Sequence, residues 1–216
     1  MRNELPTSSD APVRNGEEWA NATTHALASL ATLILGGFLI VAGREKSVAM
    51  GIACAVYTVS VFGTFLASTL SHAVQRQPLL DRFRSWDQAM IYAMISGTYT
   101  PIIFRFASPE IRPWLLAAIW IAAAVGIAGK LFLRHRINNV ATLGYLLLGW
   151  CPSIPLYGSV PAGLGWGMLL GGVLYSGGVV VLFNDHRAPY LHAVWHLLVV
   201  SAAFCHFLSI QWFVVS

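Results

Sequence analysis

Two histidines, His192 and His196, lie four residues apart in an apolar segment near the C-terminal end of the sequence. If this segment is helical, the two side chains share one face, with Cβ atoms about 5–6 Å apart. Two imidazoles in this arrangement can bind one metal ion, and zinc takes histidine nitrogens at about 2.0–2.1 Å. The pair alone is weak evidence for a metal, because histidines often have structural roles in helices.

Three other polar residues at the ends of apolar segments could complete such a site. His72 closes the segment Ser-Thr-Leu-Ser-His and could supply a third nitrogen. Zinc favours four ligands, so three histidines leave one position for water, which is the arrangement of a catalytic site. Asp87 could orient or deprotonate that water. Ser68, one helical turn before His72, could hydrogen-bond an imidazole or a substrate.

The composition indicates which elements must position these residues. Of the 216 residues, 56% are hydrophobic and 10% are charged, whereas a soluble domain has about 25% charged residues. The chain is therefore predicted to be an all-α membrane protein. Its net charge is +4, but the basic residues lie in short breaks between apolar runs. They are expected to set the topology and give no support for a nucleic-acid partner.

Seven apolar segments are each predicted to span the membrane, together forming a seven-helix bundle. A bilayer core of roughly 30 Å needs about 20 apolar residues of helix. The segments lie at about residues 21–41, 48–72, 86–104, 113–133, 139–157, 162–183 and 190–214. In the fifth, Pro152 and Pro155 would kink or end a helix. Residues 1–18 are interpreted as a polar N-terminal tail, and residues 19–216 as the transmembrane domain.

The distribution of Lys and Arg predicts a cytoplasmic N-terminus and an outside C-terminus. With this orientation, nine of the thirteen basic residues are cytoplasmic: Arg2, Arg14, Arg76, Arg82, Arg84, Lys130, Arg134, Arg136 and Arg187. The second span then ends, and the third and seventh spans begin, at the cytoplasmic side. His72, Asp87, His192 and His196 are therefore expected in one layer, which strengthens the prediction of a metal site.

The remaining histidines are predicted to have lesser roles. His206 lies ten residues beyond His196, about 15 Å deeper along a helix axis, and is interpreted as a buried packing or hydrogen-bonding residue. His25, near the start of the first span, is interpreted as a helix-end anchor, with a role behind the metal ligands as the alternative. His135 and His186 lie in loops and are expected to be solvated.

Gly163, Gly167 and Gly171 form two overlapping GxxxG steps in the sixth span. This spacing lets helix backbones approach closely. We expect it to serve packing within the chain rather than dimerisation, and the sequence sets no oligomeric state.

Four segments resemble the hemolysin III family of bacterial membrane proteins, which is related to the progestin and adipoQ receptors. They are residues 17–25 (EEWANATTH), 68–72 (STLSH), 87–101 (DQAMIYAMISGTYTP) and 192–207 (HAVWHLLVVSAAFCHF). The resemblance implies a multi-pass protein of the bacterial inner membrane with a Zn²⁺ ion near the cytoplasmic side. The family's SxxxH, Asp and HxxxH elements fall on Ser68, His72, Asp87, His192 and His196.

The resemblance also implies a function on lipids, because alkaline ceramidases share this residue pattern. We expect a zinc-dependent hydrolase of lipid amide or ester bonds, with membrane lipids as partners and a lipid amide as substrate. Two alternatives stay open. One is a non-enzymatic sensor or regulator whose zinc ties the second and seventh helices together. The other is a pore-forming or cytolytic protein, which the scarcity of polar residues elsewhere in the spans disfavours. Affinity trends leave other divalent ions open.

Overall fold

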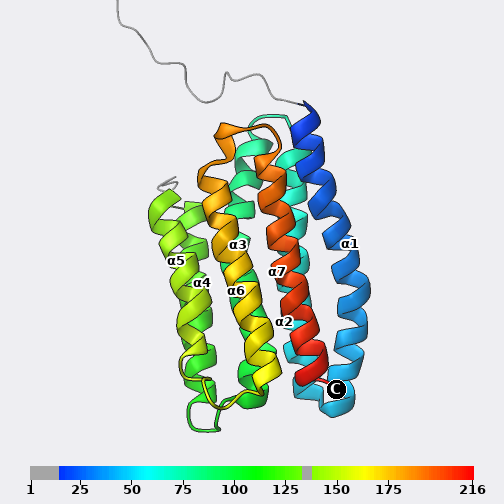
Figure 1. The fold of residues 1–216 in the computed structure, drawn as a ribbon, viewed down its shortest axis with the longest axis vertical. Helices are drawn as coiled ribbons and strands as arrows, with labels where there is room; N and C mark the ends of the chain where they lie inside the picture. Colours follow the sequence, from blue (N-terminus) through cyan, green and yellow to red (C-terminus); the bar gives the residue numbers. More distant parts are fainter. Residues whose placement is uncertain (1–14, 133–137) are drawn as a thin grey trace, which may run out of the picture.

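The computed structural model describes residues 15–132 and 138–216, and every regular element in these two stretches is helical. The helices run along the long axis of one bundle (Figure 1). The α-helices are α1 (Asn15–Lys46), α2 (Val48–Ala73), α3 (Leu79–Phe106), α4 (Arg112–Phe132), α5 (Asn138–Trp150), α6 (Ala162–Phe183) and α7 (Leu191–Phe213). Two short 3-10 helices, η1 (Cys151–Ser153) and η2 (Asp185–Arg187), lie in the connections. The predicted all-α class is confirmed.

Five of these helices are long and apolar enough to cross a membrane. They are Gly16–Lys46, Val48–Ala73, Arg112–Phe132, Ala162–Phe183 and Leu191–Phe213, and they overlap the first, second, fourth, sixth and seventh predicted spans. α3 contains the third predicted span but begins earlier, at Leu79, and its first turns carry charged residues. α5 is only 13 residues long. It gives way to η1, because Pro152 lacks the N–H that a continuing helix needs.

Some predictions fall on residues 1–14 and 133–137, which lie outside the described residues. They include the solvated His135 and the basic residues Arg2, Arg14, Arg134 and Arg136. Of the tail predicted over residues 1–18, the described residues 15–18 form the first turn of α1.

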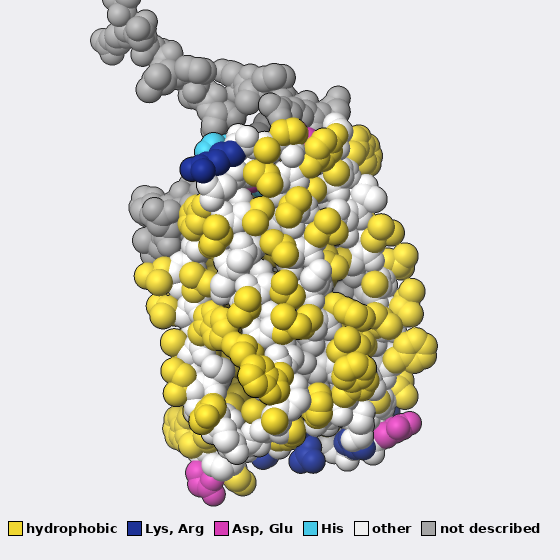
Figure 2. Space-filling view, viewed as in Figure 1, with side chains coloured by type: hydrophobic (Ala, Val, Ile, Leu, Met, Phe, Trp, Pro, Cys, Tyr) yellow, Lys and Arg dark blue, Asp and Glu magenta, His cyan; other side chains and the backbone are white. Residues whose placement is uncertain are grey.

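The sides of the bundle present apolar side chains to the surroundings (Figure 2). Phe38, Val59, Ile121, Trp166 and Val180 are between 62% and 70% exposed. Many buried positions are polar instead, among them Ser60, Thr64, Ser96, Thr98 and Thr100. An apolar exterior with internally bonded polar groups suits a hydrocarbon solvent, which offers no hydrogen-bond partners. The molecule is therefore built as an integral membrane protein.

Hydrogen bonds from buried side chains connect α3 to its neighbours. The Ser96 hydroxyl donates to the Ile119 carbonyl of α4 at 2.9 Å. The Tyr99 hydroxyl donates to the Gly149 carbonyl of α5 at 2.6 Å. These bonds satisfy groups that lipid could not, and they fix α3 within the bundle.

The glycine stripe of α6 packs against α7, as predicted. A Cβ atom added at Gly167 would overlap the Ser209 hydroxyl, and one added at Gly171 would overlap the ring of His206. The missing side chains therefore allow the two helices to approach within the chain. This packing fixes α7, whose first turns carry the HxxxH pair.

The helix directions bring several polar segments to one end of the bundle. α2 ends at the same end at which α1, α3 and α7 begin (Figure 1). The segments around His25, His72, Asp87 and His192 thus meet there, although they are far apart in the sequence.

Candidate metal centre

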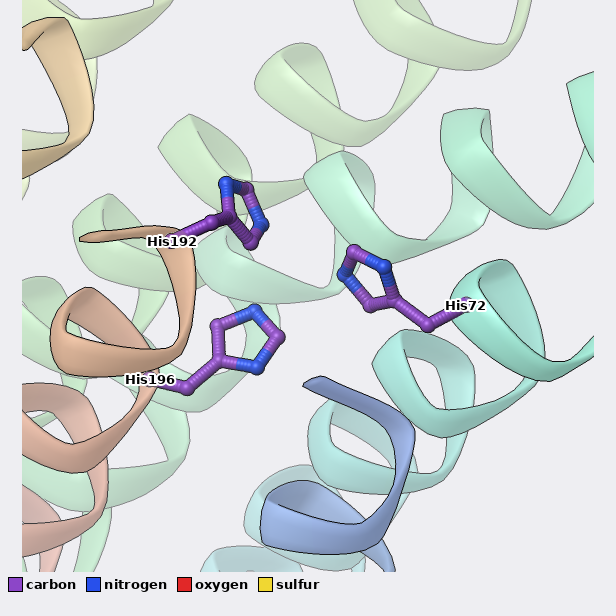
Figure 3. A group of neighbouring side chains, drawn as sticks. All are labelled: His72, His192 and His196. Carbon is purple, nitrogen blue, oxygen red and sulfur yellow. The ribbon is translucent and has the colours of Figure 1, made fainter. Parts of the chain in front are cut away.

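Three histidines meet where α2 ends and α7 begins (Figure 3). One ring nitrogen each from His72, His192 and His196 lies within 4.8 Å of the others. The ring centroid of His72 lies 5.1 Å from that of His192 and 4.9 Å from that of His196. The centroids of His192 and His196 are 4.8 Å apart. The four-residue spacing places these two rings on one face of α7, opposite His72.

Each of the three rings has an oxygen acceptor beside its Nδ1 atom. His72 Nδ1 lies 2.7 Å from Glu18 Oε2, and His192 Nδ1 lies 2.8 Å from Asp185 Oδ2. The third, His196 Nδ1, lies 3.3 Å from the backbone carbonyl oxygen of Asn21. Ionised carboxylates and carbonyls only accept hydrogen bonds, so each Nδ1 carries the proton and donates. The Nε2 atoms are thereby left as the unprotonated, metal-binding nitrogens.

Two of these Nε2 atoms, those of His72 and His196, are buried without a hydrogen-bond partner. A buried nitrogen lone pair without a partner costs about 1–3 kcal/mol. Zinc would satisfy both, because it binds neutral imidazole nitrogen. The donor set, the tautomers and the unpartnered nitrogens all fit a zinc ion.

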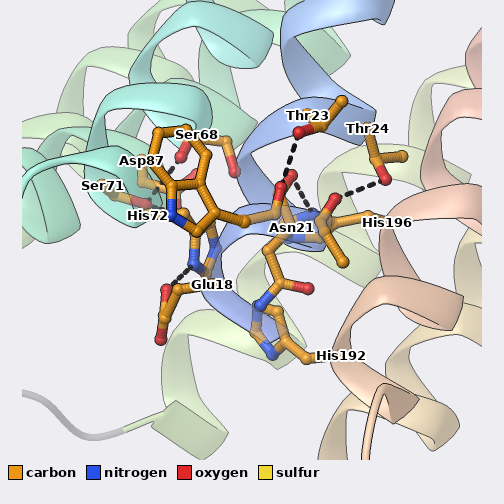
Figure 4. A network of polar contacts seen from close by, with 12 residues as sticks. Glu18, Asn21, Thr23, Thr24, Ser68, Ser71, His72, Asp87, His192 and His196 are labelled. Carbon is orange, nitrogen blue, oxygen red and sulfur yellow. Dashed lines mark hydrogen bonds and ion pairs between the residues drawn. The ribbon is translucent and has the colours of Figure 1, made fainter. Parts of the chain in front are cut away.

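The predicted acid and hydroxyl lie beside this cluster (Figure 4). Asp87, from α3, accepts a hydrogen bond from the Ser71 hydroxyl of α2 at 2.9 Å. Ser68 is 1% exposed, and its hydroxyl lies beside the Asp87 carboxyl. A carboxylate and a buried hydroxyl thus adjoin the histidines, which is the arrangement that general-base chemistry at a metal centre needs.

The N-terminal part of α1 contributes more to the site than the sequence predictions assigned to it. His25 was interpreted as a helix-end anchor, but it is 3% exposed. Its ring stacks on that of His196, with centroids 3.8 Å apart and planes 12° apart. Glu18 and Asn21 are not among the site residues predicted from the sequence. Their spacing could have indicated a shared role, because Glu18, Asn21 and His25 lie on one face of α1.

Asp185 was also missed, because it lies in the short η2 segment before α7 rather than in a predicted span. The predictions for His206 and His186 agree with the structure. His206 is 7% exposed, and its Nε2 lies 3.3 Å from the Met168 carbonyl oxygen. His186 is exposed. Neither residue belongs to the group of histidines that could share one metal ion.

Comparison with known proteins gives a consistent result over nearly the whole chain. The family model described as Haemolysin-III related matches residues 13–207. Hemolysin-3 of Bacillus cereus is 35% identical over 92% of this chain and 92% of its own length. The Hemolysin-3 homolog of Bacillus subtilis (strain 168) is 33% identical over 92% of this chain and 95% of its own length. The human monocyte to macrophage differentiation factor is 25% identical over 90% of this chain and 83% of its own length. The chain therefore belongs to the Haemolysin-III related family.

Proposed function

We propose that this protein is a zinc-dependent hydrolase of lipid amide or ester bonds in the bacterial inner membrane. The observation that carries the proposal is the set of three histidines with oxygen-bound Nδ1 atoms, two of whose Nε2 atoms are buried and unpartnered. A carboxylate and a buried hydroxyl lie beside that set. A zinc site whose only role was to cross-link helices would need neither the carboxylate nor the hydroxyl.

The proposal includes a topology of seven spans with a cytoplasmic N-terminus and an outside C-terminus. Five helices are long and apolar enough to cross a membrane, and α3 and α5 would be the other two spans. α3 is amply long, and its charged first turns would lie in the headgroup region. α5 would span together with η1. The excess of basic residues on one side supports this orientation.

In the proposed chemistry His72, His192 and His196 hold the zinc ion. When bound, zinc supplies a nucleophilic water at neutral pH and polarises the scissile carbonyl. Asp87 accepts the proton from the attacking water and returns it to the leaving amine or alcohol. The Ser68 hydroxyl donates to the oxygen on which negative charge develops.

Lipids are the proposed substrates because of where the cluster lies. It sits at one end of a bundle whose sides are apolar (Figures 1 and 2). In a bilayer this end would meet the headgroup region and the polar linkages just below it. An amide or ester bond of a lipid could therefore reach the site while its chains stay in hydrocarbon.

One alternative is a structural zinc in a membrane sensor or regulator. The origin of the three ligands favours it, because a metal there would join α2 to α7, the last helix of the chain. A pore is less consistent with the structure. Two cavities between the described helices are lined mainly by apolar side chains, whereas an ion path needs polar lining.

Hydrolysis by purified protein separates these functions. Protein with one zinc per chain would be incubated with a short-chain ceramide and with an acyl ester, and release of fatty acid would be measured. We expect cleavage by wild type and a loss of at least about 100-fold in His196→Ala and in Asp87→Asn. Glu45→Gln, at the other end of α1, is the control with unchanged activity. Zinc-loaded wild type that cleaves neither lipid, or Asp87→Asn that cleaves as fast as wild type, would contradict the proposed mechanism.

A further inference from the structure

The three metal-binding rings are not held equally by their oxygen partners. Nδ1 of His72 and Nδ1 of His192 lie 2.7 Å and 2.8 Å from carboxylate oxygens. His196 Nδ1 lies 3.3 Å from its partner, the neutral backbone carbonyl of Asn21 (Figure 4). Hydrogen bonds to charged acceptors are shorter and roughly twice as strong as those to neutral ones. The hydrogen bond alone therefore orients His196 less firmly than the other two rings.

A second ring lies flat on the ring of His196. The centroid of the His25 ring is 3.8 Å from that of His196, and the two planes are 12° apart. Three other rings approach His196 at 54° to 68°, with centroids 4.8 to 5.0 Å away, and they belong to His72, His192 and Trp195. Rotation of the His196 ring would drive its edge into the face of His25, so the stack fixes the plane of the ring.

His25 is itself held in place by its surroundings. It is 3% exposed, and its ring lies against that of Phe65 from α2, with centroids 5.0 Å apart. A ring nitrogen of His25 meets the backbone carbonyl of His196. α1 also packs along α2 and α7, the two helices that carry the three histidines. A ring held on these sides can act as a rigid support for another ring.

His25 is not placed to bind the ion that the three histidines would share. Imidazole binds a metal in the plane of its ring, and the planes of His25 and His196 are stacked. A metal in the plane of His196 therefore lies to one side of the plane of His25. Consistently, the ring nitrogens of His25 are not part of the group that could share one ion. Any effect of His25 on the ion must therefore pass through His196.

We propose that His25 is a positioning residue of the metal centre. The face of its ring fixes the plane of the His196 imidazole, so that Nε2 points toward the ion while Nδ1 donates to the Asn21 carbonyl. α1 thereby supports the centre without supplying a ligand. This inference rests on the zinc site of the proposed function, but it does not depend on the hydrolysis of any substrate.

Three substitutions separate the contacts that His25 makes. His25→Leu removes both the flat ring and its nitrogens, His25→Phe keeps a flat ring, and His25→Gln keeps a donor for the carbonyl. His206→Leu is the matched control, because His206 is also a buried histidine but lies outside the group that could share one ion. Zinc affinity of the full-length protein in detergent would be measured by competition with a chromophoric chelator. The absorption spectrum with Co²⁺ and the unfolding temperature without metal would be recorded for each variant.

We expect His25→Leu to weaken zinc binding at least about 10-fold, as is typical when a partner behind a metal-binding histidine is lost. His25→Phe should recover most of this loss, whereas His25→Gln should not, because only phenylalanine can stack on His196. The visible bands of Co²⁺ bound to His25→Leu should shift, since they report the geometry of the ligands. His206→Leu should bind both ions like wild type, even if it unfolds at a lower temperature.

Four results would overturn this role for His25. The first is wild-type zinc affinity in folded His25→Leu protein. The second is an equal loss of affinity in His25→Leu and His206→Leu, which would show a general effect of destabilisation. The third is zinc binding by His25→Phe that is no tighter than by His25→Gln, and this comparison decides alone if His25→Leu does not fold. The fourth is wild-type protein that binds no zinc, which would contradict the zinc site itself as well.

Discussion

Glu18 provides a quantitative test of how the metal centre is held together. Its Oε2 lies 2.7 Å from His72 Nδ1. The Glu18 side chain is 26% exposed, and the His72 side chain is 12% exposed. A hydrogen bond to a charged group contributes about 1.5–3 kcal/mol. Loss of an oxygen partner behind a metal-binding histidine weakens metal affinity by about 10–100-fold, which corresponds to about 1.4–2.7 kcal/mol.

Two substitutions separate the charge of Glu18 from its role as acceptor. Glu18→Gln keeps an oxygen that can accept from Nδ1, so we expect zinc affinity to fall about 10-fold. Glu18→Leu removes the acceptor, and the loss should approach about 100-fold. Competition with a chromophoric chelator measures both affinities. Glu45→Gln, at the opposite end of α1, is the matched control and should bind zinc like wild type. Folded Glu18→Leu protein with wild-type zinc affinity would refute this reasoning.

Four further results are expected. Asp185→Asn should weaken zinc binding about 10-fold in the same competition assay, because it changes the partner of His192 Nδ1. Asp87→Asn should keep one zinc per chain, by metal analysis, while hydrolysis falls at least about 100-fold. Gly167→Ala should destabilise the fold by about 1–3 kcal/mol in thermal unfolding, since its Cβ would overlap Ser209, whereas Gly165→Ala meets open space and should be neutral. A chelator should lower the unfolding temperature of wild type, because bound ligand stabilises the folded state, but not that of a variant without the three histidines.

Much of the fold follows from the sequence because the bilayer imposes a length on each apolar run. The spans at residues 48–72, 162–183 and 190–214 agree closely with α2, α6 and α7. The same reasoning placed His72, Asp87, His192 and His196 at one depth, and the three histidines do meet. Depth along a helix was thus predictable from sequence position and topology.

The rotation of each helix about its axis and the hydrogen-bond partners of the histidines were harder to predict. Glu18 falls in residues that read as a polar tail, but α1 begins at Asn15 and brings Glu18 beside His72. Asp185 lies in a loop, where a carboxylate is usually solvated. Hydropathy gives no indication that η2 turns it toward His192. These contacts depend on tertiary packing, which a single sequence does not specify.

His25 shows a related limit. A histidine at the start of an apolar helix is compatible with an exposed anchor and with a buried group. The stack on His196 decides for burial. The spacing of Glu18, Asn21 and His25 on one helical face would have favoured the buried alternative.

The zinc content of purified protein is the first test of whether the three histidines hold a zinc ion. Protein prepared without added metal would be assayed for zinc per chain in wild type, His72→Ala, His192→Ala and His196→Ala, with His186→Ala as an exposed control. We expect about one zinc per chain in wild type and in the control, and its loss in each of the other three. Well-folded wild-type protein without zinc, or zinc that persists in all three variants, would contradict this expectation.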